Sequence, residues 1–259
     1  VVVLQHLVSA KWSVVIRRLA ESITGAFPLL AVLSLGILLP LLMGNSSLYL
    51  WSDAAKVAND HVLHAKAGYL NPFFFCARVA AYFLFWLGAS HIYWTKSVAQ
   101  DESRDPKISL KLKAISGPMM IGFALTTAFS AFDFLMSLYP HWFSTIFGVY
   151  YFAGSALGIF ALLSLLTILM HRSGRLTHTI NVEHQHDLGK LLFAFVFFWG
   201  YIAFSQFMLI WMANLPEETE WFRPRMFSEW KYVSLVLLFG HFAIPFVGLI
   251  SRNVKRRWF

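Results

Sequence analysis

The sequence predicts an all-α polytopic membrane protein with at least six transmembrane helices. Three observations predict this fold class: 58% of the 259 residues are hydrophobic, only 13% are charged, and the apolar residues gather in six long stretches. A soluble domain usually carries about 25% charged and about 45–50% apolar residues, so the composition excludes an ordinary water-soluble enzyme. The net charge of +8 fits basic residues that flank membrane spans better than a nucleic-acid surface.

Each of the six stretches is long enough to cross a membrane, because a helix needs about 20 mostly apolar residues to span a hydrocarbon core about 30 Å thick. In chain order they are 23–43, with Pro28 and Pro40; 71–95, ending at Trp94; 115–138, with Pro118; 142–170, beginning at Trp142; 187–214, ending near Trp211; and 231–251, beside Trp230 and with Pro245. Membrane helices tolerate proline when neighbours satisfy the freed carbonyls, and tryptophan gathers at membrane interfaces. We expect one transmembrane domain over residues 1–259, in which the short link at 139–141 makes its flanking helices antiparallel neighbours.

Lysine and arginine are distributed unequally between the two sides that these spans define. One side carries Lys56, Lys66, Arg223 and Arg225. The other side carries fourteen basic residues: Lys11, Arg17, Arg18, Lys96, Arg104, Lys107, Lys111, Lys113, Arg172, Arg175, Arg252, Lys255, Arg256 and Arg257. The positive-inside rule predicts that this side, and with it both visible ends of the chain, faces the cytoplasm. Because the chain begins at Val1 without an initiator methionine, we expect it to start within a longer protein.

Two charged residues fall inside the predicted spans. Arg78 lies about 10 Å from the start of its span at Asn71, and Asp133 lies about 10 Å from Pro140 at the end of the next one. Because these helices run antiparallel, the two side chains lie at matched depth and are expected to form a buried ion pair. The pair either holds the helices together, or Asp133 is a protonatable carboxylate whose pKa depends on Arg78 and on burial.

Further polar residues suggest a proton path across the membrane. Thr126, Ser130, Asp133 and Ser137 share one face of their helix, and polar residues at other depths continue the series. The hypothetical path runs through Asp133, Arg78, Gln206, His241, His91 and Lys190 to a mouth formed by Glu183, His184, His186 and Asp187. His241 lies near the midplane, where neutral histidine can accept and pass on a proton. The alternative is that the stripe bonds locally and that the mouth is a solvated loop, with Asp187 as a helix cap.

Cofactor binding by the chain itself has little support in the sequence. The single cysteine, Cys76, excludes a disulfide framework, a thiolate-held iron–sulfur cluster and a Cys-x-x-Cys-His haem attachment within this sequence. Weaker alternatives are a haem between His91 and His241, a zinc ion on Glu183, His184 and His186, and a quinone slot at Tyr150, Tyr151, Phe143 and Phe147. We expect no metal and no tightly bound cofactor.

Several long motifs follow one another along the chain and carry a family resemblance. They are DHVLH at 60–64, KAGYLNP at 66–72, PHWFSTIFGVY at 140–150, NVEH at 181–184, HDLGK at 186–190, FSQFMLIW at 204–211 and ANLPEET at 213–219. Together they resemble the F-type integral membrane subunit of bacterial alternative complex III, a quinol:cytochrome c oxidoreductase. That subunit is similar to the membrane anchors of polysulfide reductase.

The resemblance implies a ten-helix subunit built of two four-helix bundles plus extra helices, of which this chain holds a part. It also implies the cytoplasmic membrane of a bacterium and partners that hold haem c and iron–sulfur clusters. These partners are a paralogous C-type membrane subunit, an iron–sulfur subunit and c-type cytochrome subunits. The segment 184–211 matches the F type and departs from the C-type pattern, and the C-type subunit carries the better-supported quinol site.

Three functions follow as expectations. The first is a subunit without a redox centre that serves proton translocation, energy coupling and assembly in a respiratory or photosynthetic chain. The second is a catalytic subunit that binds quinol directly, with Asp133 and Tyr150 as contacts. The third is a structural membrane anchor, or a transporter built on broken helices.

Overall fold

The structure is a computed structural model that describes residues 1–10, 14–175, 177 and 179–256. Among these residues every regular element is helical, which confirms the all-α fold class. The elements are α1 (Val2–Leu7), α2 (Val14–Ile23), η1 (Thr24–Ala26), α3 (Phe27–Leu42), η2 (Leu50–Ser52), α4 (Ala54–Asn59), α5 (His61–Lys66), α6 (Pro72–Ser103), α7 (Pro106–Phe134), η3 (Met136–Leu138), α8 (Phe147–Arg172), α9 (Val182–Ala213), α10 (Pro216–Thr219), α11 (Arg223–Phe227), α12 (Trp230–Val236), η4 (Leu237–Ala243), α13 (Ile244–Ile250) and α14 (Arg252–Lys255).

Six helical segments in the described part of the chain are long and apolar enough to cross a membrane. They are Val14–Leu42, Pro72–Ser103, Pro106–Leu138, Phe147–Arg172, Val182–Ala213 and Trp230–Ile250. Each predicted span falls on one of them, so the chain is a multi-pass membrane protein by the length and composition of its helices. At most 39% of the most apolar window of each segment is buried inside the described structure, as in helices that also contact lipid or other membrane proteins.

The helix ends differ from the ends of the predicted membrane spans, because hydropathy marks the lipid-immersed part of a helix and not where the helix ends. The helix predicted at 71–95 continues to Ser103, and the one predicted from residue 115 begins at Pro106. There the carboxylate of Asp105 accepts a hydrogen bond from the Lys107 N–H at 2.9 Å and caps the helix. The span predicted from residue 142 becomes helical only at Phe147.

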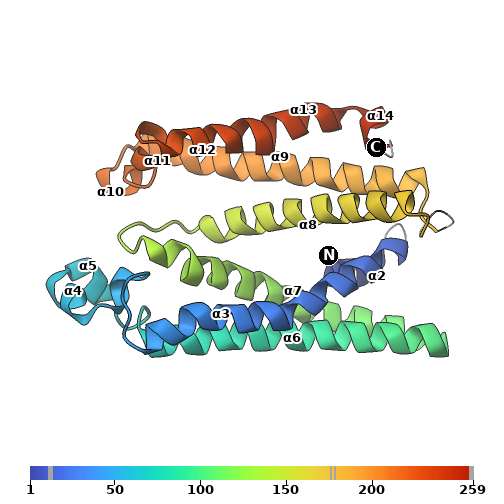
Figure 1. Ribbon diagram of the computed structural model, residues 1–259, viewed down its shortest axis with the longest axis horizontal. Helices are drawn as coiled ribbons and strands as arrows, with labels where there is room; N and C mark the ends of the chain where they lie inside the picture. The colour runs from blue at the N-terminus through green and yellow to red at the C-terminus, as the bar shows by residue number, and fades with distance from the viewer. Residues whose placement is uncertain (11–13, 176, 178, 257–259) are drawn as a thin grey trace. The chain divides into compact units, whose positions relative to one another are not determined.

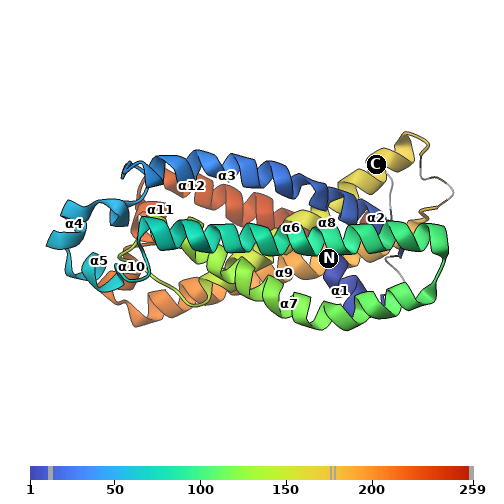
Figure 2. The same ribbon diagram turned by 90° about the horizontal axis from the view of Figure 1, so that it is seen from below.

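The chain forms two compact units. Unit 1 comprises residues 1–10 and 17–143, and unit 2 comprises residues 11–16 and 144–259. In unit 1, α6 packs against α3 and α7, and α1 packs against α7 (Figures 1 and 2). Next to the start of α6, the rings of Tyr49, Trp51 and Phe75 pack with centroids 5.0–5.3 Å apart. This aromatic core anchors the helix turn that precedes Arg78.

In unit 2, α8 and α9 lie side by side, and the segment from η4 to α13 packs along α9 (Figure 1). Gly200 permits the close approach of η4, because a Cβ atom at this position would lie 2.3 Å from Cε2 of Phe242. The element η4 is a π-helix, a widened turn that shifts the side chains after it around the helix axis. No residue in the most apolar window of Trp230–Ile250 is fully buried inside the described structure, but Phe242 and Phe246 are partly buried against the core of unit 2.

Candidate functional site

The buried charges of unit 1 are positioned by the ends of two long helices. Asn71 caps α6 by accepting a hydrogen bond from the Phe74 N–H at 2.9 Å, and Pro72 occupies the first helical position. Arg78 therefore lies in the second turn of α6. Asp133 lies at the last turn of α7, just before the chain tightens into η3.

Arg78 and Asp133 form a bidentate ion pair, which confirms the predicted pairing. Nε of Arg78 donates to Oδ2 of Asp133 at 2.9 Å, and Nη2 donates to Oδ1 at 2.8 Å. Tyr82 adds a third hydrogen bond from its hydroxyl to Oδ2 at 2.6 Å. The Asp133 side chain is fully buried, with an exposed fraction of 0%, so charge-assisted hydrogen bonds replace water around both of its oxygens.

The Arg78 guanidinium also contacts the loop before α6 and the first turn of α6. Nη1 donates to the backbone carbonyl of Tyr69 at 2.9 Å. The guanidinium carbon lies 3.8 Å from the ring centroid of Tyr69 and 4.4 Å from that of Phe74, which are favourable cation–π distances. Arg78 thus links the loop before α6, the helix α6 itself and the end of α7.

Tyr82 and Tyr69 were not among the site residues predicted from the sequence. Tyr82 could have been predicted from the sequence, because it follows Arg78 by four residues and therefore lies on the same helix face. Tyr69 contributes mainly through its backbone carbonyl and ring face, and no sequence pattern signals such a contact.

The predicted polar stripe on α7 is engaged in local hydrogen bonds. The hydroxyl of Thr126 donates to the Gly122 carbonyl at 2.8 Å and accepts from Nε1 of Trp86 at 3.0 Å. Ser130 donates to the Thr127 carbonyl at 2.9 Å, and Ser137 donates to the Asp133 carbonyl. These are the back-bonds that serine and threonine commonly make in membrane helices.

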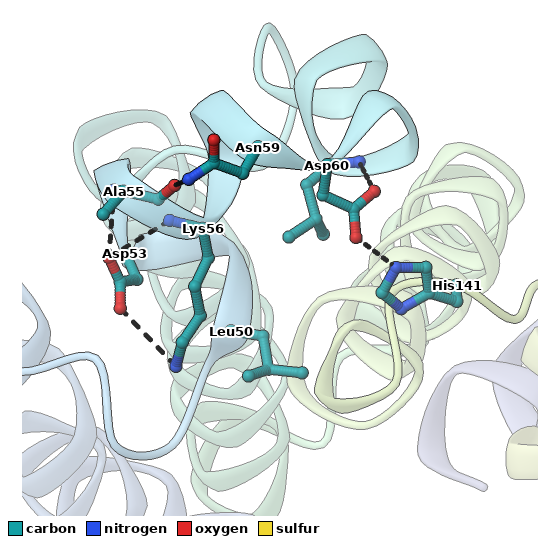
Figure 3. Close-up of a pocket in the computed structure, with 8 residues that line it drawn as sticks. Leu50, Asp53, Ala55, Lys56, Asn59, Asp60 and His141 are labelled. Atoms are coloured by element: carbon teal, nitrogen blue, oxygen red, sulfur yellow. Dashed lines mark hydrogen bonds and ion pairs between the residues drawn. The ribbon is translucent and has the colours of Figure 1, made fainter.

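A pocket of about 520 Å³ is lined by residues of the connection between α3 and α6 and by His141, which follows η3 (Figure 3). Asp60 caps α5 through one carboxylate oxygen and pairs through the other with Nε2 of His141, at 2.6 Å. The hydrogen bond from His141, together with the backbone N–H groups of α5, holds the pKa of Asp60 below its ordinary value. Asp53 caps α4 and lies 3.5 Å from Nζ of Lys56, so the acidic groups of this pocket already have partners.

The predicted mouth is helical, which corrects the loop interpretation and the assignment of Asp187 as a cap. Asn181 caps α9 by accepting from the N–H groups of Glu183 and His184, and Nδ1 of His184 accepts from the Asn181 N–H at 3.2 Å. Asn181 lies at the N-cap position, where its side chain can accept hydrogen bonds from the first free N–H groups, whereas Asp187 lies inside the helix and cannot act as the cap. Asp187 instead pairs with Lys190 at 2.6 Å.

The remaining charged groups of this mouth also form surface pairs. Glu183 lies 2.5 Å from Nη1 of Arg256 and 3.7 Å from Nδ1 of His186. In the part of the chain that the structure describes, no three His, Cys, Asp or Glu side chains gather as a metal site. The zinc alternative on Glu183, His184 and His186 therefore has no geometric support.

The other predicted path residues are divided between the two units. His91, in unit 1, is exposed, and its position on α6 is about 20 Å along the helix from Arg78. In unit 2, the half-buried ring of His241 packs edge-on against Trp199 with centroids 4.6 Å apart. Gln206 is buried, and its Nε2 has no hydrogen-bond partner among the described residues. Continuity of the path from one unit to the other stays a prediction, as does a haem between His91 and His241.

Tyr150 also belongs to unit 2, where its ring packs against Trp199 with centroids 5.7 Å apart. The joint quinone contact of Asp133 and Tyr150 thus involves both units and stays a prediction. No family model matches the chain, and no curated protein matches it.

Proposed function

We propose that this chain is an integral membrane subunit of a quinol:electron-acceptor oxidoreductase of the alternative complex III type, and that it serves proton translocation, energy coupling and assembly. The motif resemblance and the six membrane-length helices support this proposal. Haem c and iron–sulfur clusters belong to its partner subunits, as the resemblance implies, and the single cysteine of this chain could not hold either of them by thiolate ligands or a Cys-x-x-Cys-His attachment.

The buried network of Asp133, Arg78 and Tyr82 is the observation that carries the proposal. A charged residue within a membrane helix costs about 2.5–3.5 kcal/mol on insertion scales, and such residues commonly mark ion or proton pathways. A proton reaches the Asp133 carboxylate when the side chains around it shift, because the carboxylate is 0% exposed and accepts three hydrogen bonds from Arg78 and Tyr82. The arrangement supports a gated carboxylate that exchanges a proton only when its helices move.

A structural anchor is the second candidate, and the completeness of the same network favours it. Arg78 binds both carboxylate oxygens and the Tyr69 carbonyl, so it joins α6, α7 and the preceding loop without needing to move. A catalytic quinol site at Asp133 has less support, because a quinol hydroxyl would first have to displace Arg78 or Tyr82.

The proposed location is the cytoplasmic membrane of a bacterium, with both visible ends in the cytoplasm. Single cysteines introduced at Asn59 and Ser103, in a background without Cys76, test this orientation. A membrane-impermeant maleimide applied to intact cells should label the Asn59 variant. It should label the Ser103 variant only after permeabilisation, and the opposite pattern would reverse the orientation.

Purification tests membership of the complex. An affinity tag on this chain should recover a membrane complex with the absorption of reduced haem c, the electron-spin signals of iron–sulfur clusters and quinol:cytochrome c reductase activity. A chain that purifies alone, without these signals, from cells in which the untagged membranes show the activity would refute the proposal.

A further inference from the structure

The connection between α3 and α6 is fastened to the end of α7 and to the turn after η3. The hydroxyl of Tyr49 donates to the Phe134 carbonyl at 3.3 Å, and Nζ of Lys66 donates to the Pro140 carbonyl at 2.5 Å. The ion pair with His141 is a third attachment (Figure 3). All three attachments lie within unit 1, and they hold the connection against the end of α7.

The attachment of Lys66 fixes the turn that carries Tyr69. Lys66 is the last residue of α5, and its carbonyl accepts hydrogen bonds from the N–H groups of Tyr69 at 3.0 Å and of Leu70 at 2.8 Å. Leu70 in turn is buried in the aromatic core that contains Phe75. The Lys66 side chain and Leu70 therefore anchor the turn at two points, and Tyr69 lies between these anchors in the chain.

Tyr69 is the outermost member of the Asp133 network. Its ring centroid lies 3.8 Å from the guanidinium carbon of Arg78, and its hydroxyl lies close to the Asp133 carboxylate and the Tyr82 hydroxyl. Exposure falls in the same order, because Tyr69 is 36% exposed, the Arg78 side chain 10% and the Asp133 side chain 0%. The Tyr69 ring thus covers the buried pair on the side where the connection lies.

The opposite side of the network is closed by a contact between α6 and α7. One turn beyond Tyr82 on α6, Nε1 of Trp86 donates to the Thr126 hydroxyl of α7 at 3.0 Å, and the ring centroids of Tyr82 and Trp86 lie 6.2 Å apart. The connection, in contrast, carries exposed charged side chains such as Lys56, as expected for a segment in contact with water. Of the two approaches to the network, the one past Tyr69 begins at a polar surface.

We propose that Tyr69 closes the outer route to Asp133, the outer side being the side of the connection, and that the connection between α3 and α6 positions it. In the closed arrangement the Tyr69 ring covers Arg78. When the turn after α5 moves away, water reaches the ion pair, so the movement that admits a proton begins at this turn. Tyr69 is a positioning residue, because it acts by covering the pair. The inference rests on the proposed function, since it assigns the gate of the proposed proton exchange.

Hydroxyl-radical footprinting of the purified full chain in lipid nanodiscs tests this gate. Radicals made in water oxidise the tyrosine rings that water reaches, and mass spectrometry measures the rate at each ring. Tyr82 reports on the network, and Tyr93, about 16 Å further along α6, is the internal reference; both are buried in the wild-type chain. Tyr69→Ala should raise the oxidation rate of Tyr82 about tenfold and leave that of Tyr93 unchanged, because the loss of a cation–π contact shifts an opening equilibrium by about that factor.

Three further variants separate the cover from other effects of substitution. Tyr69→Phe keeps the ring and should leave the Tyr82 rate at the wild-type value. Lys66→Met removes the attachment to the turn after η3 but keeps most of the side chain, and it should raise the Tyr82 rate because the turn with Tyr69 is loosened. Lys56→Met is the matched control in the same connection, since Lys56 pairs with the cap of its own helix, and it should change nothing at Tyr82.

An unchanged Tyr82 rate in Tyr69→Ala, with Tyr93 still protected, would overturn the proposal. A rise in Tyr69→Phe as large as in Tyr69→Ala would also overturn it, since the ring would then not be the cover. If Tyr69→Ala exposes both tyrosines, the variant has unfolded, and an unchanged Tyr82 rate in Lys66→Met then counts against the proposal. The footprint does not depend on electron transfer, so the gate fails in the footprint, whereas the proposed function fails in the ratio of protons to electrons.

Discussion

Replacing Arg78 with methionine should lower the free energy of unfolding by about 3–5 kcal/mol. The substitution keeps a long apolar side chain but leaves the Asp133 carboxylate, 0% exposed, without its ion-pair partner, while the Tyr82 hydroxyl still donates to it. Removing one partner of a buried ion pair typically costs this amount, because the other charge remains buried without compensation. Tyr82→Phe removes one hydrogen bond to the same charge and should cost about 1.5–3 kcal/mol.

A double variant separates the ion pair from the packing around it. Arg78→Met combined with Asp133→Leu removes both charges, and it should recover most of the stability that Arg78→Met alone loses. Reversible unfolding in mixed micelles, followed by tryptophan fluorescence, measures each free energy. Lys190→Met is the matched control, because the pair of Lys190 and Asp187 is 56% and 27% exposed, and such surface pairs contribute less than about 1 kcal/mol.

Unfolding of Arg78→Met at the same detergent concentration as the wild-type protein would contradict the first prediction. A double variant that is no more stable than Arg78→Met would contradict the second. The first result would mean that the carboxylate is not held charged by Arg78. The second would mean that the loss comes from the cation–π contacts with Tyr69 and Phe74 instead.

Two further predictions concern packing and pH. Gly200→Ala should destabilise unit 2 by about 1–3 kcal/mol, because the added Cβ would lie 2.3 Å from Phe242, while Gly158→Ala, which meets nothing within 4 Å, should be neutral or stabilising; thermal unfolding checks both. Burial, and to a smaller extent the charge of Arg17, lowers the pKa of His6 to about 4; the unfolded chain therefore takes up the proton first, and up to about 3 kcal/mol of stability should be lost as the pH falls from about 6.5 to about 4. His6→Phe should remove this loss, and a pH dependence unchanged in the variant would contradict the assignment.

The sequence was sufficient for the fold class and for the central pair. Long apolar stretches can be satisfied in a bilayer only as helices, which is why the six spans could be predicted. Arg78 and Asp133 could be paired because consecutive membrane helices run antiparallel and each charge lies at the same depth. The contact of Tyr82 with the same pair could also have been predicted, since Tyr82 follows Arg78 by four residues in the sequence.

Helix boundaries and the mouth could not be derived in the same way. An apolar stretch of sequence ends at the membrane surface, but the helix that contains it can extend further. The helix α9 begins where Asn181 supplies a cap, so residues 183–187 are helical and not a loop. The partners of Glu183 and Asp60, which are Arg256 and His141, are distant in the sequence. Such pairs depend on tertiary packing, and no local sequence pattern predicts them.

The ratio of protons released to electrons transferred tests the central proposal most directly. The complex is reconstituted in vesicles with the Arg78→Met/Asp133→Leu chain, which should keep the helices together without a titratable group at their contact. We expect quinol-dependent electron transfer to continue and the ratio to fall below that of the wild-type complex. An unchanged ratio in the double variant, with normal assembly and turnover, would contradict a role in proton translocation and leave the structural anchor as the function of this site.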